Sequence, residues 1–286
     1  MAKLEPLKSG YYVWKYLPSV PAAAIFCILF LVATLAIVWR IWKTKNWFCI
    51  AFAIGGFFQF IGYAARISAH NQTGRLMIYI IQSTYILLAP ILYAASIYMT
   101  LGRVIRSVNG DRHSIIRPAM LTKIFVIGDV TALLVQGSSS GMSIIENLAN
   151  IGKLLMVTGL VFHILLFIFF IIVAGVFHRR MLSDHSTPNG VANGQWEVTM
   201  RMLYCVSALI IFRSVFRAIE HVMGLDGYLL SNEWPLYVFD SIPMLLVMVI
   251  FWYWFPPSMQ KIEEWRLSSG TAYGPNVVLM NERGGK

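Results

Sequence analysis

Seven long apolar segments constrain the fold of this chain more than any other feature. They cover roughly residues 20–42, 47–68, 77–101, 119–139, 151–178, 202–222 and 235–255. About 20 apolar residues suffice for one helix to cross a bilayer, so each segment is long enough to do so. The composition agrees, because 58% of the residues are hydrophobic and only 13% are charged, against about 25% charged in soluble domains. The sequence therefore predicts an all-α polytopic membrane protein, a seven-transmembrane helix bundle.

The connections between these segments are too short for a second domain. The first apolar run begins near Val20 and is longer than the core of a cleavable signal peptide, so we expect it to be retained as a helix. The predicted organisation is an extracellular N-terminal segment at 1–19, a seven-helix transmembrane domain at 20–257 and a partly disordered cytoplasmic tail at 258–286.

Lysine and arginine are distributed unevenly between the two sides of the predicted bundle. Twelve lie in the first, third and fifth connections and the near tail, and five lie on the opposite side. This asymmetry predicts an outside N-terminus and a cytosolic C-terminus. The net charge of +10 is then mainly an orientation signal and does not indicate a nucleic-acid partner. Asn71 begins the sequon Asn71-Gln72-Thr73 in a predicted outer connection and is a candidate glycosylation site.

Charged residues inside the predicted spans are the main candidates for function. A charge at the centre of a membrane helix costs about 2.5–3.5 kcal/mol, so such residues need partners. Three arginines and three carboxylates, whose charges sum to zero, fall within spans: Arg66, Arg213, Arg217, Asp129, Glu220 and Asp240. We expect them to meet in one internally paired polar cavity, nearer the outer leaflet. The alternative is that buried ion pairs only fix the packing of the helices.

The spacing of the polar residues supports such a cavity. Arg213, Arg217 and Glu220 are separated by four and three residues, which places them on one stripe of a helix. Similar stripes occur on the second, third and fourth segments: Gln59, Gly62, Tyr63 and Arg66; Gln82, Tyr85 and Ala89; Asp129 and Gln136. For Gln82 and Gln136, a hydrogen bond between helices is the simpler interpretation.

The sequence shows no pattern typical of metal, cofactor or covalent chemistry. No His-x-x-x-His pair is present, the seventh segment contains neither histidine nor lysine, and no phosphate-binding loop occurs. The three cysteines, Cys27, Cys49 and Cys205, have no framework spacing and are expected to pack as small apolar side chains. We therefore predict no cofactor, no metal and no enzymatic site.

Short motifs occur in order along nearly the whole chain. They are Gln59-Phe-Ile-Gly62-Tyr63-Ala-Ala-Arg66, Leu88-Ala89-Pro90, Ala94-Ala95-Ser96-Ile97-Tyr98, Asp129-Val130, Gln136-Gly137, Gly141, Gly152, Gly159-Leu160, Arg213-Ser-Val-Phe-Arg217-Ala-Ile-Glu220, Gly224, Glu233, Tyr237 and Phe239-Asp240. In this order they resemble the fungal RTA-like lipid-translocating exporter family.

The resemblance implies seven helices and an outside N-terminus. We expect a multi-pass protein of the plasma membrane, with the endomembranes as the alternative location. The resemblance also adds Glu233 and Tyr237 to the candidate site. Two positions depart from the family pattern, since the family commonly has Glu at the place of Gln59 and often Gln at the place of His163. A glutamine at position 59 removes a natural partner for Arg66.

The leading hypothesis is a protein that binds and moves an amphipathic ligand, such as a sphingoid base or a porphyrin-like molecule, among membrane lipids. Asp129, Glu220 and Asp240 would accept an ammonium head group or a proton. Arg213 and Arg217 would hold those carboxylates or bind a phosphate. A heptahelical lipid-sensing receptor is the first alternative, although the third segment lacks the Asp/Glu-Arg-Tyr triplet of such receptors. A lipid-modifying membrane enzyme is the second alternative.

Overall fold

The structure is a computed structural model that describes residues 18–70, 73, 75–108, 110–142, 149–183, 193–223 and 232–256. Within these ranges, seven helices are long and apolar enough to cross a membrane. They are α1 Val20–Thr44, α2 Ile50–Ala69, α3 Leu76–Ser107, α4 Pro118–Met142, α5 Ala149–Ser183, α6 Asn193–Met223 and a composite last span of α8 Trp234–Leu236, the π-helical turn η4 Tyr237–Ser241 and α9 Ile242–Tyr253. Short 3-10 turns occur at η1 Trp47–Cys49 and η2 Gly110–Arg112.

These helices confirm the predicted all-α class and the seven spans. Asn71 and Gly224 lie outside the described residues, as do most of the predicted N-terminal segment and the whole predicted tail. Several helices are longer than their apolar cores. α6 begins at Asn193, nine residues before the predicted apolar segment at 202–222. Its first turns are more polar, and in them Arg201 approaches Glu197 to 3.8 Å. Hydropathy locates only the part of a helix that lies in the bilayer.

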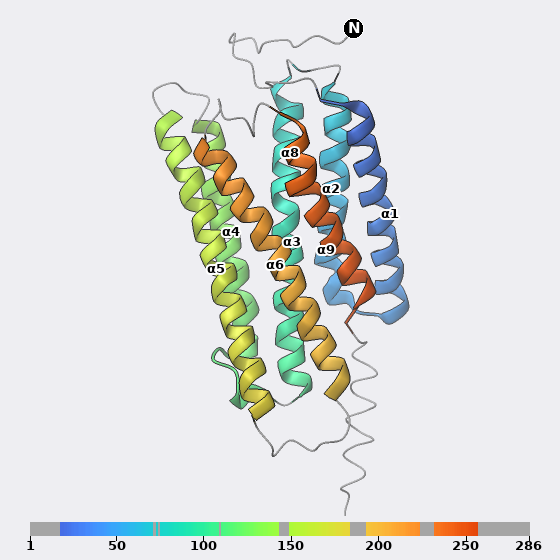
Figure 1. Ribbon diagram of the computed structural model, residues 1–286, viewed down its shortest axis with the longest axis vertical. Coiled ribbons are helices and arrows are strands. Elements are labelled where there is room, and N and C mark those ends of the chain that lie inside the picture. Colours follow the sequence, from blue (N-terminus) through green and yellow to red (C-terminus); the bar gives the residue numbers. More distant parts are fainter. Residues whose placement is uncertain are drawn as a thin grey trace, which may run out of the picture.

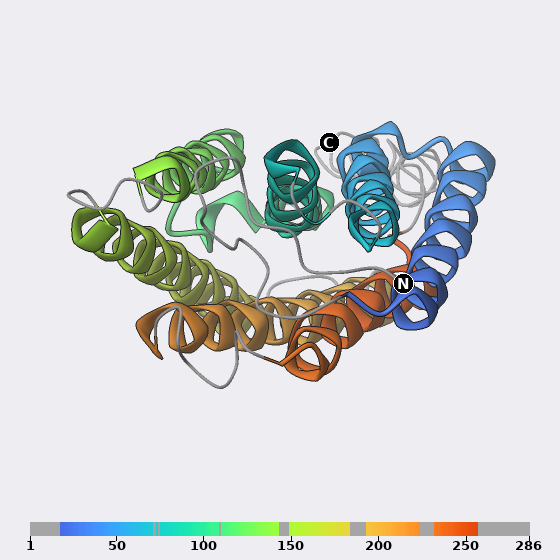
Figure 2. The ribbon, with the colours of Figure 1, turned by 90° about the horizontal axis from the view of Figure 1, so that it is seen from above.

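The seven spans form a ring of helices that run alternately up and down (Figures 1 and 2). Going round the ring, each helix contacts the next in chain order from α1 to α6, then α9 follows and contacts α1 again. α3 also contacts α6, which joins the two long sides of the ring. We call the end at which α1 begins the upper end, as it is drawn in Figure 1.

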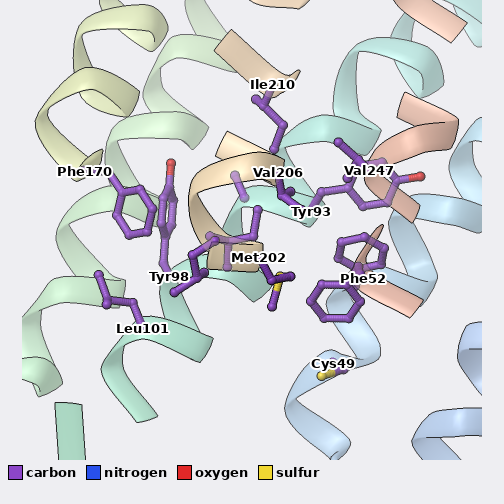
Figure 3. Close-up of a cluster of buried hydrophobic side chains, with 14 of the residues drawn as sticks. Cys49, Phe52, Tyr93, Tyr98, Leu101, Phe170, Met202, Val206, Ile210 and Val247 are labelled. Atoms are coloured by element: carbon purple, nitrogen blue, oxygen red, sulfur yellow. The ribbon is translucent and has the colours of Figure 1, made fainter. Parts of the chain in front are cut away.

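A cluster of buried apolar side chains fills the middle of the bundle (Figure 3). The rings of Phe52 and Phe251 stack at 3.9 Å between α2 and α9, and Phe52 also packs against Tyr93 of α3. On the opposite side, Tyr98 packs edge-on against Phe170 of α5. The outward faces of the helices are also apolar, as expected for surfaces that contact lipid.

A glycine allows α2 and α3 to approach closely. A Cβ atom on Gly55 would lie 2.8 Å from Cε1 of Tyr93 and 3.0 Å from the carbonyl oxygen of Ala89. Small residues at such crossings stabilise membrane bundles because they let two backbones come into contact. By contrast, a Cβ atom on Gly175 of α5 would have no neighbouring atom within 4 Å.

We predict that Gly55→Val lowers the thermal unfolding temperature of the purified protein in detergent. The added side chain overpacks the α2–α3 contact, which typically costs about 1–3 kcal/mol. Gly175→Val is the matched control and should leave the unfolding temperature nearly unchanged, since its side chain enters open space. Equal effects of the two substitutions would contradict this account of the α2–α3 contact.

Candidate functional site

The last span is interrupted by a π-helical turn at Tyr237–Ser241. Pro243 follows this turn and has no backbone N–H, while the N–H of Ile242 reaches back five residues to the carbonyl of Tyr237. The hydroxyl of Ser241 donates to the carbonyl of Leu236 at 3.2 Å. Such turns widen a helix and are frequent at functional sites. This one contains Asp240 and Ser241, and both are buried.

A central ion cluster joins this turn to α6. Nε of Arg213 donates to one oxygen of Asp240, and Nη2 of Arg217 donates to the other. Nη1 of Arg217 also donates to Oε2 of Glu220 at 3.0 Å. The central cluster is these four residues, whose formal charges sum to zero. The α6 stripe inferred from spacing thus faces the seventh span, and Asp240 is shared by two arginines.

Arg213 also connects the central cluster to α3. Its Nη2 donates to the carbonyl oxygen of Ile86 at 3.1 Å. Ile86 stands four residues before Pro90, and a proline in a helix leaves the carbonyl at that position without its usual N–H donor. The proline therefore creates an acceptor on α3 for an arginine of α6. This spacing in the sequence is the signal that could have found the contact.

A second group of polar residues lies at the upper end. Nη2 of Arg66 donates to Oε1 of Glu233 at 2.8 Å, and the hydroxyl of Tyr237 donates to the same oxygen at 2.8 Å. The backbone N–H of Ser19 lies 3.0 Å from both carboxylate oxygens. Glu233 therefore ties together the starts of α1 and α8 and the end of α2. Gln59 is uncharged and cannot form an ion pair with Arg66. Glu233 supplies the carboxylate for Arg66 instead.

The other residues predicted on α2, α3 and α4 are also buried, except Tyr85, which is half-buried. The hydroxyl of Tyr63 forms a short hydrogen bond with the hydroxyl of Ser241, which links α2 to the π-helical turn. The side-chain oxygens of Gln59 and Gln82 have no hydrogen-bond partner within the described residues. Gln136 packs where α4 meets Gly159 of α5. These glutamines lie between helices, and the two free oxygens are available as acceptors.

Asp129 stands apart from the arginines. Tyr98 donates its hydroxyl to Oδ2 of Asp129 at 2.9 Å, and Nε2 of His163 lies 3.6 Å from Oδ1. Nδ1 of His163 is 3.4 Å from the hydroxyl of Ser214 on α6. The six charges of the spans therefore do not form a single paired network. Tyr98, His163 and Ser214 are missing from the set of predicted site residues, because nothing in their spacing relates them to Asp129.

Metal binding finds no support in the described part of the chain. Within it, no group of three or more His, Cys, Asp or Glu side chains gathers as a candidate set of metal ligands. The arrangement offers charged and hydrogen-bonding side chains inside an otherwise apolar bundle.

Comparison with known proteins identifies the family. The sequence profile described as RTA1 like protein matches residues 52–262. The chain belongs to the RTA1-like family. Protein RTA1 of Saccharomyces cerevisiae is 35% identical over 274 residues, which covers 87% of this chain and 86% of that protein.

Two further relatives in this family carry names that state a function. Protoporphyrin uptake protein 1 of Saccharomyces cerevisiae is 29% identical over 282 residues, covering 85% of this chain and 91% of its own length. A sphingoid long-chain base transporter, RSB1, of the same species is 22% identical over 261 residues, covering 76% of this chain and 68% of its own length. No solved structure matches the chain. This chain is thus a multi-pass membrane protein of a fungal family with named transport and uptake proteins.

We predict that Asp240→Asn strongly destabilises the protein. The substitution removes the carboxylate that the buried Arg213 and the half-buried Arg217 both contact, and breaking a buried ion pair on one side typically costs about 3–5 kcal/mol. Thermal unfolding in detergent is the measurement. The control Glu197→Gln disrupts an exposed pair with Arg201 and should cost no more than about 1 kcal/mol. An unfolding temperature of Asp240→Asn equal to that of the control would contradict the central cluster.

The upper group should be sensitive to acid. Partial burial raises the pKa of Glu233, but the hydrogen bonds from Tyr237 and Arg66 outweigh it and hold the pKa below its usual range. A carboxylate with a lowered pKa in the folded state stabilises the protein above its unfolded pKa of about 4.3 and loses that contribution as the pH falls through the folded value. The wild type should therefore unfold at a higher temperature than Glu233→Gln near neutral pH, and this difference should shrink below about pH 4. A constant difference across this range would contradict the ion pair.

Proposed function

We propose that this protein is a translocator of amphipathic lipids with a cationic head group, of the sphingoid long-chain base kind, in the plasma membrane. The observation that carries the proposal is the central cluster of Arg213, Arg217, Glu220 and Asp240, which lies between α3, α6 and the last span and in which all but the half-buried Arg217 are buried. Buried charges are costly in a membrane and commonly mark substrate or ion pathways. The named functions of two relatives concern a sphingoid base and a porphyrin, and both ligands are amphiphiles.

The surroundings of the cluster favour a ligand with one polar end. The side chains below it, toward the middle of the bundle, are apolar and include Ile210, Val206 and Met202 of α6 (Figure 3). An acyl chain would lie among such side chains while the head group meets the charges. With the N-terminus outside, as the lysine and arginine distribution indicates, the cluster lies in the outer half of the bilayer.

The central cluster suggests which carboxylate a cationic head group would meet. Asp240 already accepts from two arginines, so neither of its oxygens is without a strong donor. Glu220 has one ion-pair contact, at Oε2. An ammonium would therefore compete with Arg217 at Glu220. An anionic ligand such as a porphyrin carboxylate would instead compete with Asp240 for the arginines.

We predict that Glu220→Gln lowers the flux of a fluorescent sphingoid base in proteoliposomes by roughly tenfold, the effect of about 1.5 kcal/mol from one charge-assisted hydrogen bond. Release of long-chain bases from cells that express the variant at the normal surface level should fall in parallel. Glu197→Gln, at the lower end of α6, is the matched control and should transport like the wild type.

Three outcomes would count against the proposal. Unchanged flux of Glu220→Gln at normal surface expression would show that this carboxylate does not contact the head group. Saturable binding of the sphingoid base without any flux in the wild type would favour the alternative of a heptahelical lipid sensor. Conversion of the lipid into a new product by the purified protein would favour a membrane enzyme.

A further inference from the structure

Asp129 is the buried carboxylate that the central cluster does not use. It is fully buried on α4 and lies where α3, α5 and α6 come together. Gly128 beside it permits this approach, since a Cβ there would lie 2.6 Å from Cδ1 of Leu166 on α5. His163 is three residues before Leu166 and so shares the face of α5 that meets Asp129. The site is therefore part of the packing of four helices.

The polar contacts of Asp129 leave one of its oxygens free. Tyr98 occupies Oδ2 with a hydrogen bond of 2.9 Å. Oδ1 has no hydrogen-bond partner in the described part of the chain, and Nε2 of His163 lies 3.6 Å from it. Nε2 is likewise without a hydrogen-bond partner there. A proton on Oδ1 would face this nitrogen.

The charges around Asp129 do not neutralise it. The titratable groups that face it are Tyr98 from α3 and His163 from α5, and α6 contributes the neutral Ser214 at His163. Arg213 precedes Ser214 on α6, but it is engaged with Asp240 and the Ile86 carbonyl. An unneutralised carboxylate is strongly disfavoured inside a bundle. Asp129 and His163 must therefore hold one proton between them, either on the carboxyl or on the imidazole, and both arrangements are neutral.

We propose that Asp129, with His163 as its neighbour, is a second position for the ammonium head group of an amphiphile, distinct from its position beside Glu220, and that Asp129 exchanges a bound proton for this head group. In this exchange, the carboxylic acid of Asp129 and an alkylammonium become a carboxylate–ammonium ion pair and one proton, which passes to water. The charge inside the bundle stays balanced in both states. This inference rests on the proposed function for the ammonium ligand, but the proton site itself does not depend on it.

The position of the site links it to the central cluster. Ser214 contacts His163, and the preceding residue, Arg213, holds Asp240. A displacement of α6 that accommodates a ligand at one group would therefore shift the other. Proton release at Asp129 and head-group binding would then be coupled, which is the requirement for proton-driven export of a cation.

The exchange is tested by the pH dependence of ligand binding. The probe is dodecylamine, because an alkylammonium like that of lysine titrates near 10.4 and stays charged at about pH 5–8. If binding displaces one proton, the affinity of the wild type in nanodiscs for dodecylamine increases as the pH is raised, by up to about tenfold per pH unit. Asp129→Asn keeps an acceptor for Tyr98 but carries no titratable group, so its affinity should be lower and independent of pH. Glu197→Gln should behave like the wild type.

A pH-independent affinity of the wild type, or an equal slope in Asp129→Asn, would overturn the exchange while leaving the proposed function intact. Infrared spectroscopy tests the proton site without any ligand. In His163→Gln the proton can reside only on Asp129, so this variant should show a protonated-carboxyl band at neutral pH that Asp129→Asn/His163→Gln lacks. Absence of that difference would overturn the proton site. If no amphiphile binds at all, the proposed function fails and the infrared band alone decides the proton site.

Discussion

An arginine inside a membrane bundle needs an acceptor before its helix can pack, and Arg213 and Arg217 share one carboxylate, that of Asp240. This sharing fixes the rotation of α6, because only one stripe of that helix can face the last span. It also fixes the local geometry of the last span, where a π-helical turn places Asp240 between the two guanidinium groups. The packing of α6 against α9 and α3 thus follows from satisfying two buried charges.

The remaining polar contacts extend this constraint to the other helices. The carbonyl that Pro90 frees on α3 gives Arg213 its second acceptor, and the hydroxyl pair of Tyr63 and Ser241 adds α2. At the upper end, Glu233 connects α1, α2 and α8 through Arg66 and the N–H of Ser19. Since lipid competes equally well for apolar surfaces, these polar contacts and the close approach at Gly55 specify which helix faces meet.

The helix count and the α6 stripe could be predicted because both depend only on local sequence, namely hydropathy and a period of 3.6 residues. Which polar residues of different helices contact each other could not be predicted. Those contacts depend on how each helix is rotated about its axis, and the lipid-facing and core-facing sides of the helices are both apolar. Glu233 lies just before the apolar run and carries no hydropathy signal, so only the family resemblance pointed to it. His163 stands alone in an apolar helix, and nothing in its spacing indicates Asp129. Pro90 is evident in the sequence, and a proline in a helix frees the carbonyl four residues before it. The same spacing therefore predicts a free acceptor in other membrane helices.

The central claim is that an amphiphile places its head group at the central cluster inside the ring of helices. A cryo-electron microscopy structure of the protein in nanodiscs with a bound sphingoid base tests this most directly. The account predicts elongated density between α2, α3, α6 and α9, with its polar end beside Glu220 and Asp240. Density confined to the lipid-facing surface, with the central cluster out of reach of the head group, would contradict it.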